Sequence, residues 1–292
     1  MRRGLVEELG VGRELIANSR VTVGGALATK SQRMVSAADP VVLLRAPSRY
    51  VCRSAHKLDA ALDRFGLDVT GLRALDVGAS TGGFTDCLLQ RGAGEVTALD
   101  VGHGQLDPKI RHDDRVLVRE RCDVRKAQIT DVGGPFDLIV VDVSFVSLER
   151  ISADLTRLAA PRAEAVVLVK PQFEASEAEV GRGRGVITDP EIWRRALHST
   201  IADLEVRSWS VAGLMAAPLK GAKGNTEFPL WLVRSRVEAP NDPGPRDAGP
   251  VEPTPTRCDS AVDRGRPSVE ELVERAVTEA AAPDRAPDAE VR

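Results

Sequence analysis

The chain has 292 residues, of which 42% are hydrophobic and 28% are charged. No apolar run approaches the roughly 18 residues of a membrane-spanning helix, which argues against a transmembrane protein. The formal net charge of −3 is unevenly distributed, because the last 55 residues hold 13 acidic residues against 7 arginines and no lysine. The remainder is mildly basic, which is compatible with a nucleic-acid partner without requiring one.

The N-terminal residues indicate where in the cell the protein resides, and the cysteine spacing indicates whether it has disulfide bonds or a metal site. Met1 to Gly4 leads into charged and polar residues without an apolar secretory segment, so we expect a cytoplasmic protein. The four cysteines are too scattered for a Cys-x-x-Cys pair, and the four histidines lie at no metal-ligand spacing relative to them. We therefore expect neither a disulfide scaffold nor a metal site.

Residues 1–46 form a small predicted front module. The pattern predicts a helix over Gly12–Ser19, then a strand from Arg20 that enters a tight turn at Gly24-Gly25, and later a second strand over Val41–Leu44.

Three segments of this module, Val11–Ile16, Arg20–Gly25 and Ala28–Lys30, resemble the S4 RNA-binding module. The resemblance implies a small α+β domain whose basic side chains contact RNA phosphates. The alternative is that these side chains form an ordinary solvated surface. The chain begins at what corresponds to the end of the first S4 helix, so we expect a shortened module or a true start upstream. The candidate RNA-contacting residues are Arg13, Arg20, Lys30 and Arg33.

After a predicted interdomain linker at residues 47–56, strands and helices alternate over residues 57–237. Such repetition is typical of an α/β domain with a mostly parallel sheet, and the ligands of these domains collect at the carboxyl ends of the strands. The predicted strands are Ala74–Val77, Val96–Leu99, Val116–Val118, Asp137–Val141, Ala165–Val169 and Leu230–Val233.

The first of these strands runs into a turn with Gly78, Gly82 and Gly83, which opens a helix that extends to about Arg91. Glycines there let the backbone approach a ligand closely. The spacing Gly-x-x-x-Gly-Gly differs from the dinucleotide fingerprint, and no Gly-Lys-Ser/Thr follows, which argues against NAD and against a P-loop. Asp100, at the end of the next strand, is placed to accept hydrogen bonds from ribose hydroxyls, or else is a surface carboxylate.

The segments Leu75–Thr85 and Ala98–Val101 resemble the S-adenosylmethionine pocket of a class I methyltransferase, a Rossmann-like α/β fold with a seven-stranded sheet. The resemblance implies S-adenosylmethionine as the cofactor. It also implies that Asp123 lies near the adenine, with a plain loop residue as the alternative. The implied cofactor-binding residues are Asp76, Gly78, Ala79, Ser80, Thr81, Gly82, Gly83, Phe84, Asp100 and Asp123.

The residues after the strand Asp137–Val141 narrow the class of methyl acceptor. The sequence Asp142-Val143-Ser144-Phe145 differs from the Asp/Asn-Pro-Pro-Tyr/Phe of enzymes that methylate base amines, and no Pro-Cys or Thr-Cys nucleophile supports carbon-5 methylation. A hydroxyl acceptor remains. A ribose 2′-hydroxyl is a very weak acid, so its methylation needs a base that is neutral when it acts. A lysine meets this need where burial or a second cation disfavours its charge.

Four charged residues stand at the ends of predicted elements of this domain. Lys57 precedes the first helix, Asp142 and Lys170 follow two strands, and Glu227 precedes a late strand. Singly each suggests a surface ion pair, but in this order they match the Lys-Asp-Lys-Glu tetrad of the FtsJ-like 2′-O-ribose methyltransferases. The resemblance implies Lys170 as the base, Lys57 and Asp142 as groups that tune and position it, and Glu227 as the group that orients the ribose or the amines.

An S4-like module followed by an FtsJ-like domain resembles the TlyA family, haemolysin-like cytidine 2′-O-methyltransferases of ribosomal RNA, over roughly Arg2 to Val237. The resemblance implies that a cytidine of 16S or 23S ribosomal RNA, or of both, is methylated, with ribosomal subunits as partners. We expect a monomer. Departures from the family pattern are Cys52-Arg53-Ser54-Ala55, where Ser-Arg-Gly-Gly is favoured, and Cys122-Asp123, where Thr-Asn is common.

Two alternative functions are an S4-type RNA-binding protein with a catalytically silent methyltransferase fold and a membrane-lysing haemolysin. The second lacks support, because no long amphipathic stretch has an aromatic apolar face. Gly181–Gly185 is a predicted flexible basic loop whose Arg182 and Arg184 clamp RNA phosphates, or is an ordinary surface loop. Phe145 and Phe173 either stack on a flipped-out base or belong to the core.

The segment Glu238–Arg292 holds 9 of the 18 prolines and no aromatic residue, a composition that buries too little apolar surface to offset chain entropy. We predict an acidic, proline-rich disordered tail. Within it, Ser268 to Glu271 resembles a capping box, and Leu272, Val273 and Val277 are spaced for a marginal helix that ends near Ala282.

Overall fold

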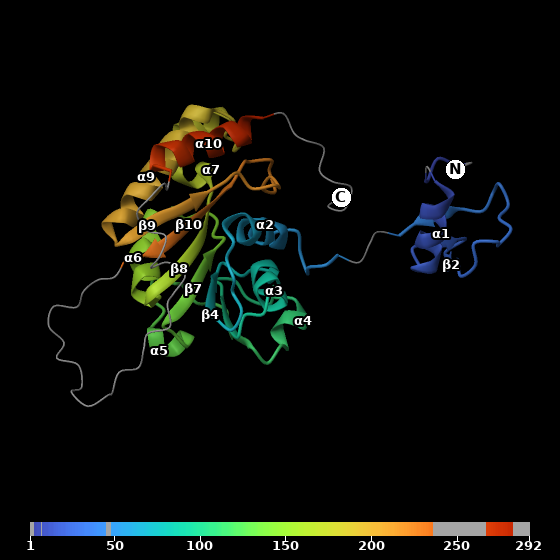
Figure 1. Cartoon of the computed structure of the whole chain (residues 1–292), viewed down its shortest axis with the longest axis horizontal. Helices are drawn as coiled ribbons and strands as arrows, with labels where there is room; N and C mark the ends of the chain where they lie inside the picture. Colours follow the sequence, from blue (N-terminus) through green and yellow to red (C-terminus); the bar gives the residue numbers. More distant parts are fainter. Residues whose placement is uncertain (1–2, 7, 45–47, 236–266, 283–292) are drawn as a thin grey trace. The chain divides into compact units, whose positions relative to one another are not determined.

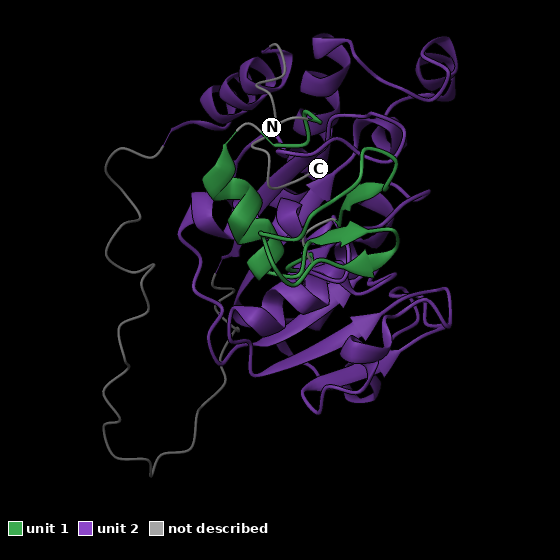
Figure 2. Ribbon diagram, turned by 90° about the vertical axis from the view of Figure 1, so that its right-hand side faces the viewer, with its two compact units in different colours: residues 1–49 green, residues 50–292 purple. Residues whose placement is uncertain are grey.

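The structure is a computed structural model that describes residues 3–6, 8–44, 48–235 and 267–282. The chain divides into two compact units, residues 1–49 and residues 50–292, which Figure 2 colours separately. Each unit is described by itself below.

The first unit is a helix followed by a three-stranded antiparallel sheet in the order β2-β1-β3. A two-residue turn joins β1 to β2, and both of its glycines have positive φ, 60° at Gly24 and 82° at Gly25, as a tight hairpin requires. The predicted helix and the two predicted strands are present, whereas the very short β2 was not anticipated. The elements are α1 (Leu9–Ala17), β1 (Val21–Val23), β2 (Ala26–Leu27) and β3 (Val41–Leu43).

The second unit is built on a seven-stranded sheet in the order β6-β5-β4-β7-β8-β10-β9 (Figure 1). Five neighbouring strands are parallel, and β10 runs antiparallel to both β8 and β9. The predicted mostly parallel, seven-stranded α/β sheet is thereby confirmed. The strands are β4 (Arg73–Val77), β5 (Glu95–Leu99), β6 (Val116–Arg119), β7 (Phe136–Val141), β8 (Ala159–Val169), β9 (Trp209–Leu214) and β10 (Phe228–Arg234).

Helices cover both faces of this sheet, because successive residues of a strand point to opposite sides. Leu75 and Val77 of β4 belong to one core with residues of α6, α9 and α10. Ala74 of the same strand belongs to a second core with residues of α2 and α3. The helices are α2 (Ala55–Phe65), α3 (Gly83–Gln90), α4 (Pro108–Arg111), α5 (Ile129–Val132), α6 (Glu149–Leu158), α7 (Pro171–Glu174), α8 (Glu177–Arg182), α9 (Pro190–Val206) and α10 (Val269–Ala281).

The helix α10 corrects the prediction of a disordered tail. Ser268 and Glu271 form the reciprocal capping box, as the sequence suggested. The helix is not marginal, because it buries Leu272 and Val273 among others in the core and Arg194 of α9 binds Glu274 at 2.5 and 3.0 Å. A composition averaged over 55 residues hides one amphipathic helix. The rest of the predicted tail lies outside the described residues.

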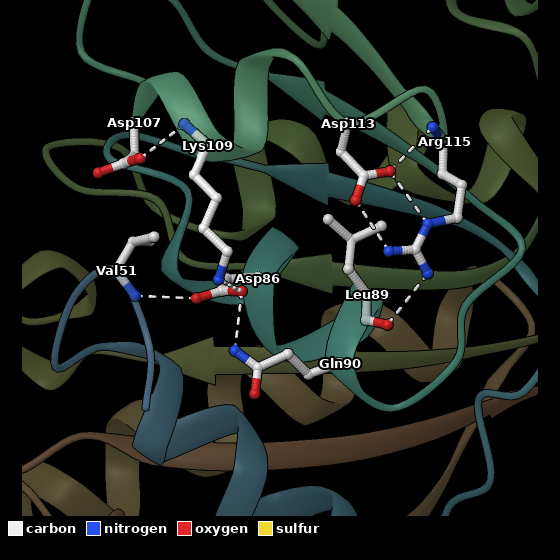
Figure 3. Close-up of polar contacts among 8 residues, drawn as sticks. All are labelled: Val51, Asp86, Leu89, Gln90, Asp107, Lys109, Asp113 and Arg115. Carbon is white, nitrogen blue, oxygen red and sulfur yellow. Dashed lines mark hydrogen bonds and ion pairs between the residues drawn. The ribbon is translucent and has the colours of Figure 1, made fainter. Parts of the chain in front are cut away.

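The predicted linker at residues 47–56 also needs correction, because its second half belongs to the second unit. Tyr50 is buried in the core beside α2. The backbone N–H of Val51 donates to Asp86 on α3 at 2.8 Å, and the same carboxylate binds Gln90 and Lys109 (Figure 3). The domain therefore begins at residue 50 rather than at residue 57.

Candidate functional site

The glycine turn after β4 brings two strand ends into contact at the carboxyl edge of the sheet. Gly78 has a φ of 88°, and a Cβ atom there would lie 2.6 Å from the carbonyl oxygen of Asp142, at the end of β7. The N–H of Asp142 in turn donates to the carbonyl of Val77. Only glycine combines this conformation with so close an approach. The first position of the motif therefore joins the predicted cofactor turn to the predicted catalytic strand.

Asp100, at the end of β5, lies beside the glycine turn as predicted. Its carboxylate accepts hydrogen bonds from the N–H groups of Ser80 at 2.8 Å and Gly102 at 2.7 Å. The hydroxyl of Ser80 also donates to Gln105 at 3.3 Å. The cavity between these loops has a volume of about 10 Å³. The cavity is lined by Ala79, Ser80, Ala98, Asp100, Gly102, Gln105, Leu106, Val118 and Glu120.

Several predicted cofactor residues shape the turn without lining this cavity. Asp76 is fully buried on β4, where it accepts a 2.6 Å hydrogen bond from the hydroxyl of Thr85. Burial raises the pKa of Asp76 to about 7, and the nearby charges of Asp142 and Asp100 act in the same direction. Its second oxygen has no hydrogen-bond partner among the described residues. Phe84 is likewise part of the core.

The remaining members of the cofactor set are placed around the same turn, except for one. Gly82 has a φ of 92° and precedes Gly83, the first residue of α3, while the carbonyl of Thr81 accepts the N–H of Asp107. Asp123 is not among the residues that line the cavity. Its carboxylate is held by Arg125 at 2.6 Å, which also lowers the pKa of Asp123.

A fit to S-adenosylmethionine can be tested on this geometry. The Asp100 carboxylate, which lies at the small cavity beside the glycine turn after β4, suits a ligand with ribose hydroxyls. The residues present therefore fit the predicted cofactor.

Lys170 and Asp142 form an ion pair of 2.5 Å at the ends of β8 and β7. The lysine is 7% exposed, and its amine also donates to the hydroxyl of Ser144 at 3.1 Å. The aromatic ring of Phe173 lies with its centroid 6.0 Å from the same nitrogen. The amine is thus held by two oxygens that stand two residues apart on the loop after β7.

Lys57 and Glu227 form a second buried ion pair, between α2 and the residue before β10. In the antiparallel register of β8 and β10, Phe228 pairs with Val169, so the next step places Glu227 opposite Lys170. The structure therefore brings all four predicted residues to one edge of the sheet. The fold determines which residues pair, because each lysine binds a carboxylate from a distant part of the chain.

Phe145 is 89% exposed and has a φ of 66°, a conformation that bulky residues rarely adopt. Its ring contacts Phe173 with centroids 5.3 Å apart. The core alternative for Phe145 is therefore wrong, and an exposed aromatic face lies beside the Lys170–Asp142 pair.

The segment predicted as a flexible basic loop is partly helical. Gly181 and Arg182 end helix α8, and Arg184 has a φ of 51° in the hydrogen-bonded turn that follows. A buried residue that the sequence analysis missed, Asn225, holds this turn from the other side. Its side chain accepts the N–H of Ile187 and donates to the carbonyl of Gly185, both at 2.8 Å.

Asn225 precedes Glu227 by two residues and is 3% exposed. The sequence does carry a signal for Asn225, because it lies two residues before a candidate catalytic residue. Its amide can both donate and accept hydrogen bonds, and so can bind loop N–H and carbonyl groups that lack backbone partners. The amide joins the basic turn to the chain that carries Glu227.

Most of the predicted RNA-contacting side chains of the first unit are exposed to solvent. Arg13, Lys30 and Arg33 are exposed, whereas Arg20 donates to the carbonyl of Leu44 and helps to close the small sheet.

In the described part of the chain, no three His, Cys, Asp or Glu side chains are grouped closely enough to hold a metal ion. No helix in the same residues is long and apolar enough to cross a membrane.

The strand order, the antiparallel β10 and the glycine turn after β4 define a Rossmann-like methyltransferase domain. The family model of the FtsJ-like methyltransferases matches residues 50–234. The 16S/23S rRNA (cytidine-2′-O)-methyltransferase TlyA of Mycobacterium tuberculosis is 41% identical over 249 residues, which cover 85% of this chain and 92% of that protein.

Two solved structures agree with this match. A hemolysin-named protein from Streptococcus thermophilus is 32% identical with a TM-score of 0.65, over 95% of this chain and 93% of that one. A hemolysin-named protein from Lactococcus lactis is 42% identical with a TM-score of 0.63, over 65% of this chain and 90% of that one. The chain belongs to the TlyA family of FtsJ-like methyltransferases.

Proposed function

We propose that this chain transfers the methyl group of S-adenosylmethionine to the 2′-oxygen of a cytidine in ribosomal RNA. The observation that carries the proposal is the meeting of Lys57, Asp142, Lys170 and Glu227 at one sheet edge, beside the turn that follows β4. The Mycobacterium tuberculosis relative is named for methylation of a cytidine 2′-oxygen in 16S and 23S rRNA. The family membership supports the same reaction class.

The cofactor half of the site binds and orients the donor. The Asp100 carboxylate accepts hydrogen bonds from ribose hydroxyls, and the close backbone approach at Gly78 brings the glycine turn against the backbone of Asp142. When bound, S-adenosylmethionine supplies a methyl group attached to a positively charged sulfur. The contact between Gly78 and the Asp142 backbone supports a donor held close to the Lys170–Asp142 pair, as a direct transfer in one line requires.

Lys170 acts as the general base. It takes the proton from the ribose 2′-hydroxyl while Asp142 holds its amine in place. Lys57 and Glu227 form the second buried ion pair at the same sheet edge.

The surfaces around the pair suit a nucleotide that has left its helix. The exposed ring of Phe145 offers a stacking face for the target base. Arg182 is the last residue of helix α8, and Arg184 lies in the turn that follows, which Asn225 holds through Gly185 and Ile187. On the first unit, Arg13, Lys30 and Arg33 are exposed. We assign these cations to phosphate contacts in ribosomal RNA, so binding weakens as salt rises.

The test supplies radiolabelled S-adenosylmethionine with small subunits, large subunits or free rRNA from a strain that lacks the enzyme. The protein is compared with Lys170→Ala and with Lys170→Arg, which keeps the charge but cannot give up its proton. Label at a cytidine 2′-oxygen that vanishes in both variants supports the proposal and identifies the substrate subunit.

The same panel separates the alternative of a catalytically silent RNA-binding protein. Cofactor binding without transfer to any of the three RNA substrates contradicts the enzymatic proposal and favours that alternative. Transfer that persists in Lys170→Arg contradicts the assignment of the base alone.

A further inference from the structure

We propose that Ser144 is a positioning residue that sets the direction of the Lys170 amine. This inference rests on the proposed role of Lys170 as the base. The nitrogen of Lys170 lies 3.1 Å from the Ser144 hydroxyl oxygen and 2.5 Å from a carboxylate oxygen of Asp142. Both oxygens come from the short segment that follows β7, and both accept hydrogen bonds from the amine.

The number of acceptors matters because of the shape of an amine. A neutral lysine has two N–H bonds and one lone pair in a tetrahedral arrangement, at the end of four rotatable bonds. One acceptor leaves the group free to rotate about its hydrogen bond. Two acceptors, Asp142 and Ser144, occupy both N–H bonds, so the lone pair takes the one remaining direction. A base whose lone pair is fixed is prepared for the ribose hydroxyl.

The bonds of the reaction are consistent with this arrangement. The proton of the 2′-hydroxyl passes to the lone pair on the Lys170 nitrogen, and the 2′-oxygen forms its bond to the methyl carbon. The carbon–sulfur bond breaks, and its electron pair stays on sulfur. The resulting ammonium of Lys170 keeps both hydrogen bonds, while the transferred proton occupies the third position.

The backbone keeps Ser144 where it is needed. The next residue, Phe145, has a φ of 66°, so the chain turns sharply directly after the serine. The Phe145 ring then rests on Phe173, three residues after Lys170. The segments that follow β7 and β8 are thus joined by Asp142, by Ser144 and by the two rings, and also by the N–H of Leu148, which donates to Glu174 at 3.0 Å. A left-handed bulky residue persists only where its surroundings hold it, which is why we take this geometry as evidence of function.

The test compares Ser144→Ala with Ser144→Thr, which retains the hydroxyl, and with Ser147→Ala, a serine-to-alanine change three residues later in the same loop. We expect Ser144→Ala to lower the single-turnover rate of methyl transfer at saturating RNA and cofactor by about 10- to 100-fold, because the base is misdirected. The KM for RNA and the affinity for S-adenosylmethionine should change less than about twofold. Ser144→Thr should recover most of the rate, and Ser147→Ala should resemble the parent.

Two results would overturn the assignment. A rate for Ser144→Ala equal to that of Ser147→Ala removes any role in the chemical step. A loss confined to the KM for RNA makes Ser144 an RNA contact instead. Thermal unfolding of each variant, with an unchanged midpoint, excludes a general loss of structure.

A double variant separates this inference from the proposed function. If Ser144 acts through Lys170, adding Ser144→Ala to Lys170→Ala lowers the residual rate no further. A further drop contradicts the inference even if Lys170 is the base. Full activity of Lys170→Ala alone contradicts the proposed base itself.

Discussion

The two halves of the sheet edge are built in different ways. The proposed cofactor half is one contiguous stretch, residues 76–85, with Asp100 from the next strand, and its shape depends on backbone conformation at Gly78 and Gly82. The proposed catalytic half is assembled from side chains that are up to 170 residues apart, and it depends on buried ion pairs. The first half should therefore be most sensitive to added side-chain volume at its glycines, whereas the second should be most sensitive to loss of a charge.

The largest expected effect comes from breaking the buried pair of Lys57 and Glu227. Lys57→Met leaves the Glu227 carboxylate buried and unpaired, which should cost about 3–5 kcal/mol of unfolding free energy and abolish transfer. The double variant with Glu227→Gln should regain most of the stability without regaining activity. Denaturant unfolding and the transfer assay measure the two quantities.

An exposed pair provides the control for that prediction. Arg73 and Glu95 bind at 2.9 Å but remain well exposed, so Arg73→Met should change stability by about 1 kcal/mol or less. Equal costs for Lys57→Met and Arg73→Met would show that the catalytic half does not depend on its buried charges.

The next largest effect tests the backbone half. Gly78→Ala places a methyl group 2.6 Å from the Asp142 carbonyl in a left-handed conformation, and we expect a loss of about 2–3 kcal/mol together with weaker S-adenosylmethionine binding. Gly104→Ala is the matched control, because Gly104 also has positive φ but nothing within 4 Å of the added atom. Calorimetric titration with the cofactor should separate the two variants, and equal binding would contradict the close-approach argument.

A smaller effect on stability and transfer rate is expected from changing Asn225, which connects the basic turn to the segment before Glu227. Asn225→Ala removes the partners of the Ile187 N–H and the Gly185 carbonyl, at a cost of about 1–3 kcal/mol, and should slow transfer by loosening the chain before Glu227. Ser176→Ala removes the cap at the opposite end of α8 for about 1 kcal/mol and should leave the rate unchanged. A rate loss in Ser176→Ala as large as that in Asn225→Ala would mean that the whole turn, rather than the amide, matters.

A separate prediction concerns the pH dependence of stability. Because burial raises the pKa of Asp76 to about 7 from 3.8, the folded state holds a proton that the unfolded state has lost between these values. Stability contributed by this group should therefore fall as pH rises from about 4 to about 7. Asp76→Asn, which can still accept from Thr85, should flatten this slope in unfolding experiments. A slope that is unchanged in the variant would show that Asp76 is not the titrating group.

Much of the fold was predictable because its signals are local. Buried parallel strands are continuous apolar runs, and the glycine turn is a contiguous motif, so the strand β4 and the turn that follows it were predictable from the sequence. The capping box at Ser268 likewise marked the start of α10. The linker boundary at residues 47–56 and the burial of α10 in the core were not predicted, because both depend on packing against other elements, which a local composition does not report.

The residue types of the site can be read from the sequence, as can the strand ends on which Asp142 and Lys170 stand. The three-dimensional fold sets the pairing of Lys57 with Glu227, the contact of Ser144 with the Lys170 amine, and the hydrogen bonds of Asn225 to the basic turn. These two kinds of information act over different distances along the chain. Strand and turn preferences act over a few residues, whereas ion-pair partners are chosen by sheet register and by burial, which join segments far apart in the chain.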